Sequence, residues 1–84
     1  MKNKVLVTVR IPEIDESYDV YLPVNRKIGN IINLLINSIK DLNEIEFEDN
    51  CDLFLYSSIT GEKYDIDKLL YNTDIRNGSI IYLI

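Results

Sequence analysis

The stretch LYNTDIRNGSIIYLI, residues 70–84, carries the pattern on which the predicted fold depends. Leu70 and Ile75 anchor a compact crossover, Gly78 marks a turn, and Ile81 and Leu83 belong to a final apolar run. A glycine turn followed by a short run of branched and aromatic residues is typical of a β-strand. We therefore expect a sheet-containing domain in which residues 79–84 form the last strand.

Two further strands are predicted near the N-terminus. Valine and isoleucine occupy every second position from Val5 to Ile11, a period of two that puts them on one buried face. Residues 18–22 alternate in the same way and end at Pro23, which lacks the N–H of a ladder donor. With the polar connector 12–16 between them, these segments predict a hairpin.

From Ile28 the apolar spacing becomes helical. Asn25 is expected to cap the helix, which should end at Leu42 and Asn43, because asparagine suits both termini. Leu34 lies about 120° off the apolar stripe at roughly 100° per residue, and we expect it to be exposed. The stripe predicts an amphipathic helix that covers the sheet, and it comprises Ile28, Ile31, Ile32, Leu35, Ile39 and Leu42.

The remaining segments predict a loop and two strands. Residues 41–52 contain six acidic side chains and no basic one, which indicates a solvated loop. A calcium site is not favoured, because its loop needs a fixed ligand order and a turn glycine. Residues 53–56 are predicted as a third strand, and residues 60–63 as a turn into a short strand around Tyr64. No repeat or linker divides the chain, so residues 1–84 are interpreted as one domain.

Composition limits the function classes. Nine basic and 14 acidic residues give a net charge of −5, which repels a phosphate backbone, so nucleic acid is not an expected partner. The single cysteine permits no internal disulfide. No export signal and no apolar run long enough for membrane insertion are visible. We expect a cytoplasmic protein whose oligomeric state the sequence leaves open.

Catalytic chemistry has few candidates. The chain has no histidine, which excludes Ser-His and Cys-His nucleophile pairs. Cys51 lies next to an acidic residue, which disfavours a thiolate. The carboxylate pairs Asp15/Glu16 and Asp65/Asp67 are expected on a solvated surface without a cleft to separate their pKa values. We expect no catalytic residue, no cofactor site and no metal site.

The element order resembles the β-grasp fold of ubiquitin, an α+β arrangement (ββαβββ) with a mixed sheet packed on one amphipathic helix. Within it, residues 18–20, 23–24 and 28–39 and the segment Ile75–Gly78 resemble the YukD/EsaB family across nearly the whole chain. Thr73 and Ser79 depart from that family's aromatic and aspartate. The resemblance implies a non-conjugating adaptor of a type VII secretion system in Gram-positive bacteria, bound to a membrane or ATPase component.

An open sheet face is the candidate site. In a β-grasp sheet of order 2-1-5-3-4, the residues that alternate with the buried ones point away from the helix. We expect them to form a continuous apolar patch for protein binding. The alternative is that some are covered by loops and that the exposed tyrosines are ordinary sheet residues. The candidate protein-binding residues are Leu6, Thr8, Phe54, Tyr56, Ile80, Tyr82 and Ile84.

A second function remains open. A ubiquitin-like modifier or sulfur carrier needs a mobile Gly-Gly tail, and the printed chain ends in the predicted strand without one. We therefore expect activity through folded surface contact, with a modifier or carrier of atypical or processed C-terminus as the alternative. Neighbouring genes for a secretion ATPase or for an activating enzyme would distinguish the two.

Overall fold

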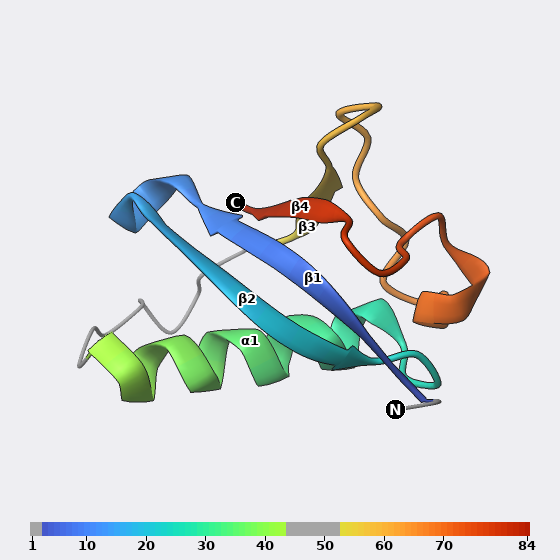
Figure 1. Cartoon of the computed structure of the whole chain (residues 1–84), viewed down its shortest axis with the longest axis horizontal. Helices are drawn as coiled ribbons and strands as arrows, with labels where there is room; N and C mark the ends of the chain where they lie inside the picture. Colours follow the sequence, from blue (N-terminus) through green and yellow to red (C-terminus); the bar gives the residue numbers. More distant parts are fainter. Residues whose placement is uncertain (1–2, 44–52) are drawn as a thin grey trace.

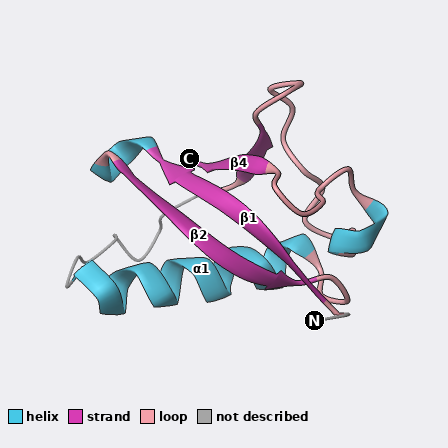
Figure 2. Cartoon of the chain, in the orientation of Figure 1, coloured by secondary structure: helices cyan, strands magenta, loops and turns pink. Residues whose placement is uncertain are grey.

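The computed structural model describes residues 3–43 and 53–84 (Figure 1). Its strands are β1 (Lys4–Ile11), β2 (Glu16–Pro23), β3 (Leu55–Ser57) and β4 (Ile80–Leu83), and its helix is α1 (Ile28–Asn43). Two short 3-10 turns, η1 (Pro12–Ile14) and η2 (Leu70–Asn72), lie in the connections (Figure 2).

The described strands form a four-stranded mixed sheet of order β2-β1-β4-β3. Strand β1 is antiparallel to β2 and parallel to β4, and β3 is antiparallel to β4. The crossover from α1 to β4 therefore returns the chain to the centre of the sheet. This arrangement, with one helix packed on the sheet, is the predicted β-grasp fold.

The third and fourth predicted strands differ from the expectation. Strand β3 begins at Leu55 rather than at residue 53, although Phe54 and Ile84 exchange both backbone hydrogen bonds, at 2.8 and 3.0 Å. The short strand expected around Tyr64 is only a bridge between Tyr56 and Lys63. Two hydrogen bonds flank that bridge, from the Tyr64 N–H to the Leu55 carbonyl and from the Ser57 N–H to the Glu62 carbonyl, each at 2.9 Å.

One apolar core lies between the sheet and α1. The alternation predicted for the first strand is confirmed: Val7, Val9 and Ile11 are at most 1% exposed. The helical stripe is buried from Ile28 to Ile39, while the side chain of Leu42 lies outside the described residues. Leu34 is 49% exposed, as its position off the stripe predicts.

The predicted cap of the helix is wrong. Helix α1 begins at Ile28, three positions after Asn25. The N–H groups of Ile28 and Gly29 donate to the carbonyls of Lys68 and Ile66, at 2.9 and 3.0 Å. The first-turn donors that a capping side chain would satisfy are thus taken by backbone from a distant segment, which ties the N-terminus of α1 to the crossover.

The crossover is fixed against β1 at Gly78. This residue has a φ of 86°, a left-handed conformation that favours glycine. Its N–H donates to the Leu6 carbonyl at 2.8 Å. The Asn77 side chain accepts a hydrogen bond from the Leu6 N–H, also at 2.8 Å. Together these bonds set the start of β4 beside β1.

Candidate protein-binding surface

The seven predicted binding residues lie outside the core. Leu6 and Ile84 are 38% and 52% exposed, and the other five are half-buried. Their strand neighbours Val7, Ile81 and Leu83 are all buried against α1. Alternation along the strands therefore places the seven on the opposite, open face.

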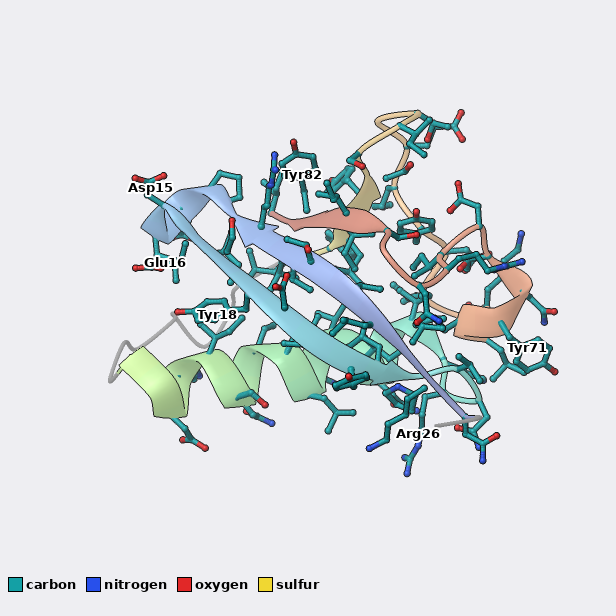
Figure 3. All side chains as sticks on the ribbon, viewed as in Figure 1. Asp15, Glu16, Tyr18, Arg26, Tyr71 and Tyr82 are labelled. Atoms are coloured by element: carbon teal, nitrogen blue, oxygen red, sulfur yellow. The ribbon has the colours of Figure 1, made fainter. Side chains whose placement is uncertain are left out.

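Aromatic residues gather on the β3–β4 half of this face. Tyr56 and Tyr82 are directly paired across the two strands, and Phe54 lies beside Ile84 through its backbone hydrogen bonds. Figure 3 shows the Tyr82 side chain projecting on the side of the sheet away from α1. Phe54, Tyr56 and Tyr82 are named here the aromatic cluster.

Two basic residues that the sequence interpretation missed adjoin the aromatic cluster. Arg10 is the register partner of Tyr82 on β1. The Lys63 ammonium lies 4.4 Å from the centre of the Phe54 ring, within the range of a cation–π interaction. Arg10 could have been found, because the alternation through Leu6 and Thr8 continues to it. Lys63 could not, because its position depends on the turn after β3.

The other half of the open face is polar at its centre. The Thr8 hydroxyl donates to an Asp19 carboxylate oxygen at 2.7 Å. Beyond this pair, Leu6 faces Tyr21, which is 57% exposed. This hydrogen-bonded pair makes the β1–β2 side of the open face partly polar, whereas on the β4 side the register partner of Thr8 is the half-buried Ile80.

Phe54 stands between two open hollows. One, of about 380 Å³, also contacts Leu53, Ile32 and Ile66. The other, of about 350 Å³, is lined by Phe54, Lys63, Tyr64, Asp65 and Ile66. Ile66 is 43% exposed. A partner side chain seated here would contact an aromatic ring and an aliphatic side chain, with a lysine at the rim.

A third hollow, of about 310 Å³, is polar and includes Tyr64 and Asp74. The Tyr64 hydroxyl donates to an Asp74 carboxylate oxygen at 2.7 Å. Burial, followed by this hydrogen bond, raises the pKa of Tyr64 to about 12. The phenol therefore stays protonated at neutral pH, and in this hollow it serves as a hydrogen-bond donor.

The other side chains considered from the sequence have local roles or lie outside the described residues. Asp15 adopts a left-handed conformation, with a φ of 52°, at the end of η1. Asp65 accepts a hydrogen bond from the Asp67 N–H at 2.9 Å. Cys51 and the rest of residues 44–52 in the acidic segment lie outside the described residues, whereas residues 41–43 belong to α1. Within residues 3–43 and 53–84, no three His, Cys, Asp or Glu side chains group as a metal site would require.

Comparisons with known proteins identify the fold. No model of a known protein family matches the sequence, and no curated protein sequence matches it. Among solved structures, the ubiquitin-like domain of EccD5 from Mycobacterium xenopi is 15% identical, with a TM-score of 0.79 over 96% of this chain and 92% of that chain. The ubiquitin-like domain of the type VII secretion system protein EccD1 from Mycobacterium tuberculosis is 14% identical, with a TM-score of 0.75 over 96% and 97% of the two chains. The chain has a ubiquitin-like fold.

This fold is also found in an unrelated setting. A chain of a toluene 4-monooxygenase complex is 9% identical, with a TM-score of 0.77 over 95% of each chain. At identities this low, the similarity concerns the backbone fold alone, and a shared fold does not imply a shared activity. None of the described helices is long and apolar enough to cross a membrane. Because these similarities show the fold alone, evidence for the function comes from the surface of this chain.

Proposed function

We propose that this chain is a cytoplasmic ubiquitin-like accessory protein of the YukD/EsaB type. It binds a membrane or ATPase component of a type VII secretion system and acts as an adaptor, without catalysis and without covalent attachment. The proposal is supported by the resemblance of its sequence to that family. The likeness of its fold to ubiquitin-like domains of EccD proteins is consistent with it.

The observation that carries the proposal is the aromatic cluster on the open face of the sheet. Phe54, Tyr56 and Tyr82 come from neighbouring strands and are only half-buried in the free chain. Aromatic residues with an adjacent arginine are enriched in protein interfaces, where they combine a large contact area with polar groups at the rim. Arg10 and Lys63 supply that rim here.

The test is affinity capture from the bacterium that encodes the chain, with captured proteins identified by mass spectrometry. We expect the parent chain to capture a type VII secretion component. The double variant Phe54→Ser/Tyr82→Ser should bind the partner at least about thirtyfold more weakly, because aromatic residues at an interface centre commonly contribute about 2 kcal/mol or more each. Tyr71→Ser is the matched control, since Tyr71 is 52% exposed on η2, away from Tyr82 (Figure 3).

Folding of the variants is measured in parallel by circular dichroism. Both cluster side chains are half-buried, so their loss should cost about 1 to 2 kcal/mol of stability and leave the fold intact. Undiminished capture by the folded double variant would show that the partner binds elsewhere. A different result is that the parent chain captures only proteins that have no part in secretion and the double variant loses them. That result would support the aromatic cluster as the binding site and refute the secretion role.

A further inference from the structure

The free edge of β2 lies apart from the aromatic cluster. Strand β2 has eight residues and lies at the edge of the sheet, where β1 is its only neighbour among the described strands. Figure 1 shows it at the rim of the sheet, between β1 and α1 in this view. An exposed strand edge of this length is a template for pairing with another strand.

The register identifies which backbone groups this edge presents. Leu6 and Thr8 direct their backbone bonds toward the β4 side, to Gly78 and Ser79. Because bonding direction alternates along a strand, Val5, Val7 and Val9 bond toward β2, and their partners there are Leu22, Val20 and Tyr18. The intervening residues of β2, Ser17, Asp19 and Tyr21, therefore point their N–H and C=O groups outward.

These outward groups have no backbone partner among residues 3–43 and 53–84. No strand pairs with the outer side of β2 in this part of the chain, and Ser17, Asp19 and Tyr21 are all exposed. Three consecutive donor–acceptor pairs are thus available in the alternating pattern that an added strand requires.

One flank of α1 borders this edge. The Gly29 N–H donates to the Ile66 carbonyl at 3.0 Å, and Gly29 shares a hollow with Leu53 and Phe54, so its flank faces the β3 side. Leu34 lies roughly 140° around the helix from Gly29 at about 100° per residue. It is on the opposite flank, toward β2, and is 49% exposed. An added strand would place alternate side chains near this leucine.

The charge along the edge selects the occupant. Residues 11–25 contain four acidic residues and no lysine or arginine. Asp15, Glu16 and Asp19 are exposed, and Figure 3 shows Asp15 and Glu16 together at the start of β2. Antiparallel pairing of β2 with β2 of a second copy, centred on Asp19, would place the two Asp19 carboxylates directly opposite each other, which repulsion disfavours. An extended segment with basic side chains would be attracted.

We propose that the β2 edge binds an extended, basic peptide segment of a partner protein as an added strand. The segment pairs its backbone with Ser17, Asp19 and Tyr21 and places lysine or arginine near the acidic end of β2. Aliphatic side chains on its other face contact the Leu34 flank of α1. This site takes a different ligand from the aromatic cluster and can be occupied independently of it.

The probe is a blocked peptide of alternating lysine and valine, with eight residues to match β2. Its binding to the isotope-labelled chain is followed by NMR and by amide hydrogen exchange. We expect shifts and slowed exchange at the amides of Ser17, Asp19 and Tyr21. Two control peptides of the same length, one of alternating glutamate and valine and one of lysine and proline with the repeat Lys-Lys-Pro-Pro, should produce no such protection. The first has the wrong charge. The second keeps four lysines but has a proline at every second bonding position in either register, so it cannot form a continuous strand ladder.

Tyr21→Pro removes one outward N–H and leaves the bonds from β2 to β1 in place. The Tyr21→Pro variant should bind the lysine–valine peptide about fivefold more weakly than Tyr21→Ala does, because one net hydrogen bond contributes about 1 kcal/mol. Glu16→Gln/Asp19→Asn should also weaken it, because two attractive charges are lost while the backbone groups remain. The Phe54→Ser/Tyr82→Ser variant should bind this peptide as the parent does, so failure here and failure of the proposed function are distinguishable.

Three outcomes would overturn the proposal. The first is peptide-induced shifts confined to the aromatic cluster or to other surfaces, or no shifts at all. The second is equal binding of the lysine–proline peptide, which would indicate charge attraction without strand pairing. The third is a concentration-dependent dimer, measured by sedimentation, in which the amides of Ser17, Asp19 and Tyr21 are already protected without peptide.

Discussion

At the scale of single residues, Tyr64 illustrates how the turn after β3 is held. Its ring packs against the edge of the core and its hydroxyl donates to Asp74 at 2.7 Å. Tyr64 thus links the segment after β3 to the crossover before β4 through a hydrogen bond between side chains. The protonated phenol is the form that the fold stabilises.

We predict that Tyr64 titrates apart from the other tyrosines. Its pKa is raised to about 12, above the value of about 10 for an unfolded tyrosine. A raised pKa means that its contribution to stability is complete below about pH 10 and is lost as the pH rises from about 10 to about 12. Ultraviolet absorbance of the ionised phenols should show a separate late step, absent in Tyr64→Phe. Asp74→Asn should lower this pKa only in part, because burial is its first cause; a return to about 10 would contradict that order.

At the scale of elements, the glycines at the ends of α1 and β4 have different physical roles. Gly78 needs its φ of 86° to turn the chain onto β1. Gly29 lies in the first turn of α1, where an added Cβ would be 3.4 Å from the Ile66 carbonyl and 3.5 Å from the Ile66 Cβ. At Gly78 the backbone conformation disfavours any residue with a Cβ. At Gly29 only the space beside Ile66 limits a larger side chain.

The same substitution at these two glycines should have opposite effects. Gly78→Ala should lower the free energy of unfolding by about 1 to 2 kcal/mol, the cost of the left-handed conformation for a residue with a Cβ. Gly29→Ala should be neutral or should raise stability by up to about 1 kcal/mol, because alanine favours the helix. Chemical denaturation of both variants measures the difference. A Gly29→Ala variant less stable than Gly78→Ala would show that the contact with Ile66 outweighs backbone strain.

Elements defined by periodicity were predictable from the sequence, and those defined by long-range contacts were not. The alternation of β1 and the stripe of α1 gave both buried faces, because each period follows from one element's own geometry. The cap of α1 was predicted wrongly, because the groups that accept from its first N–H groups are the carbonyls of Ile66 and Lys68. The residues of β1 and β4 that alternate with the buried ones were correctly predicted to lie outside the core, because side chains alternate between the two faces of a strand. Lys63 was missed because only the register of the sheet brings it over Phe54.

At the scale of the whole molecule, the two proposed binding surfaces lie at opposite sides of the sheet. The aromatic cluster belongs to β3 and β4, and the free edge belongs to β2. Between them, β1 pairs with β2 and β4 and supplies three of the most deeply buried side chains. A central strand that pairs with the neighbours of both regions gives each a rigid support.

This arrangement predicts a gradient of stability across the sheet, measurable by native-state hydrogen exchange. Amides of Val7 and Val9, which bond toward β2, and of Thr8, which donates to Ser79 at 2.9 Å, should exchange only by global unfolding. Amides near β3 should open at lower free energy, because this strand has three residues and its outer side is held by one bridge and two backbone hydrogen bonds. The outward amides of Ser17, Asp19 and Tyr21 should exchange fastest within the strands, since no described backbone group accepts from them. Protection of these three amides equal to that of β1 in the free, monomeric chain would mean that the β2 edge is already occupied.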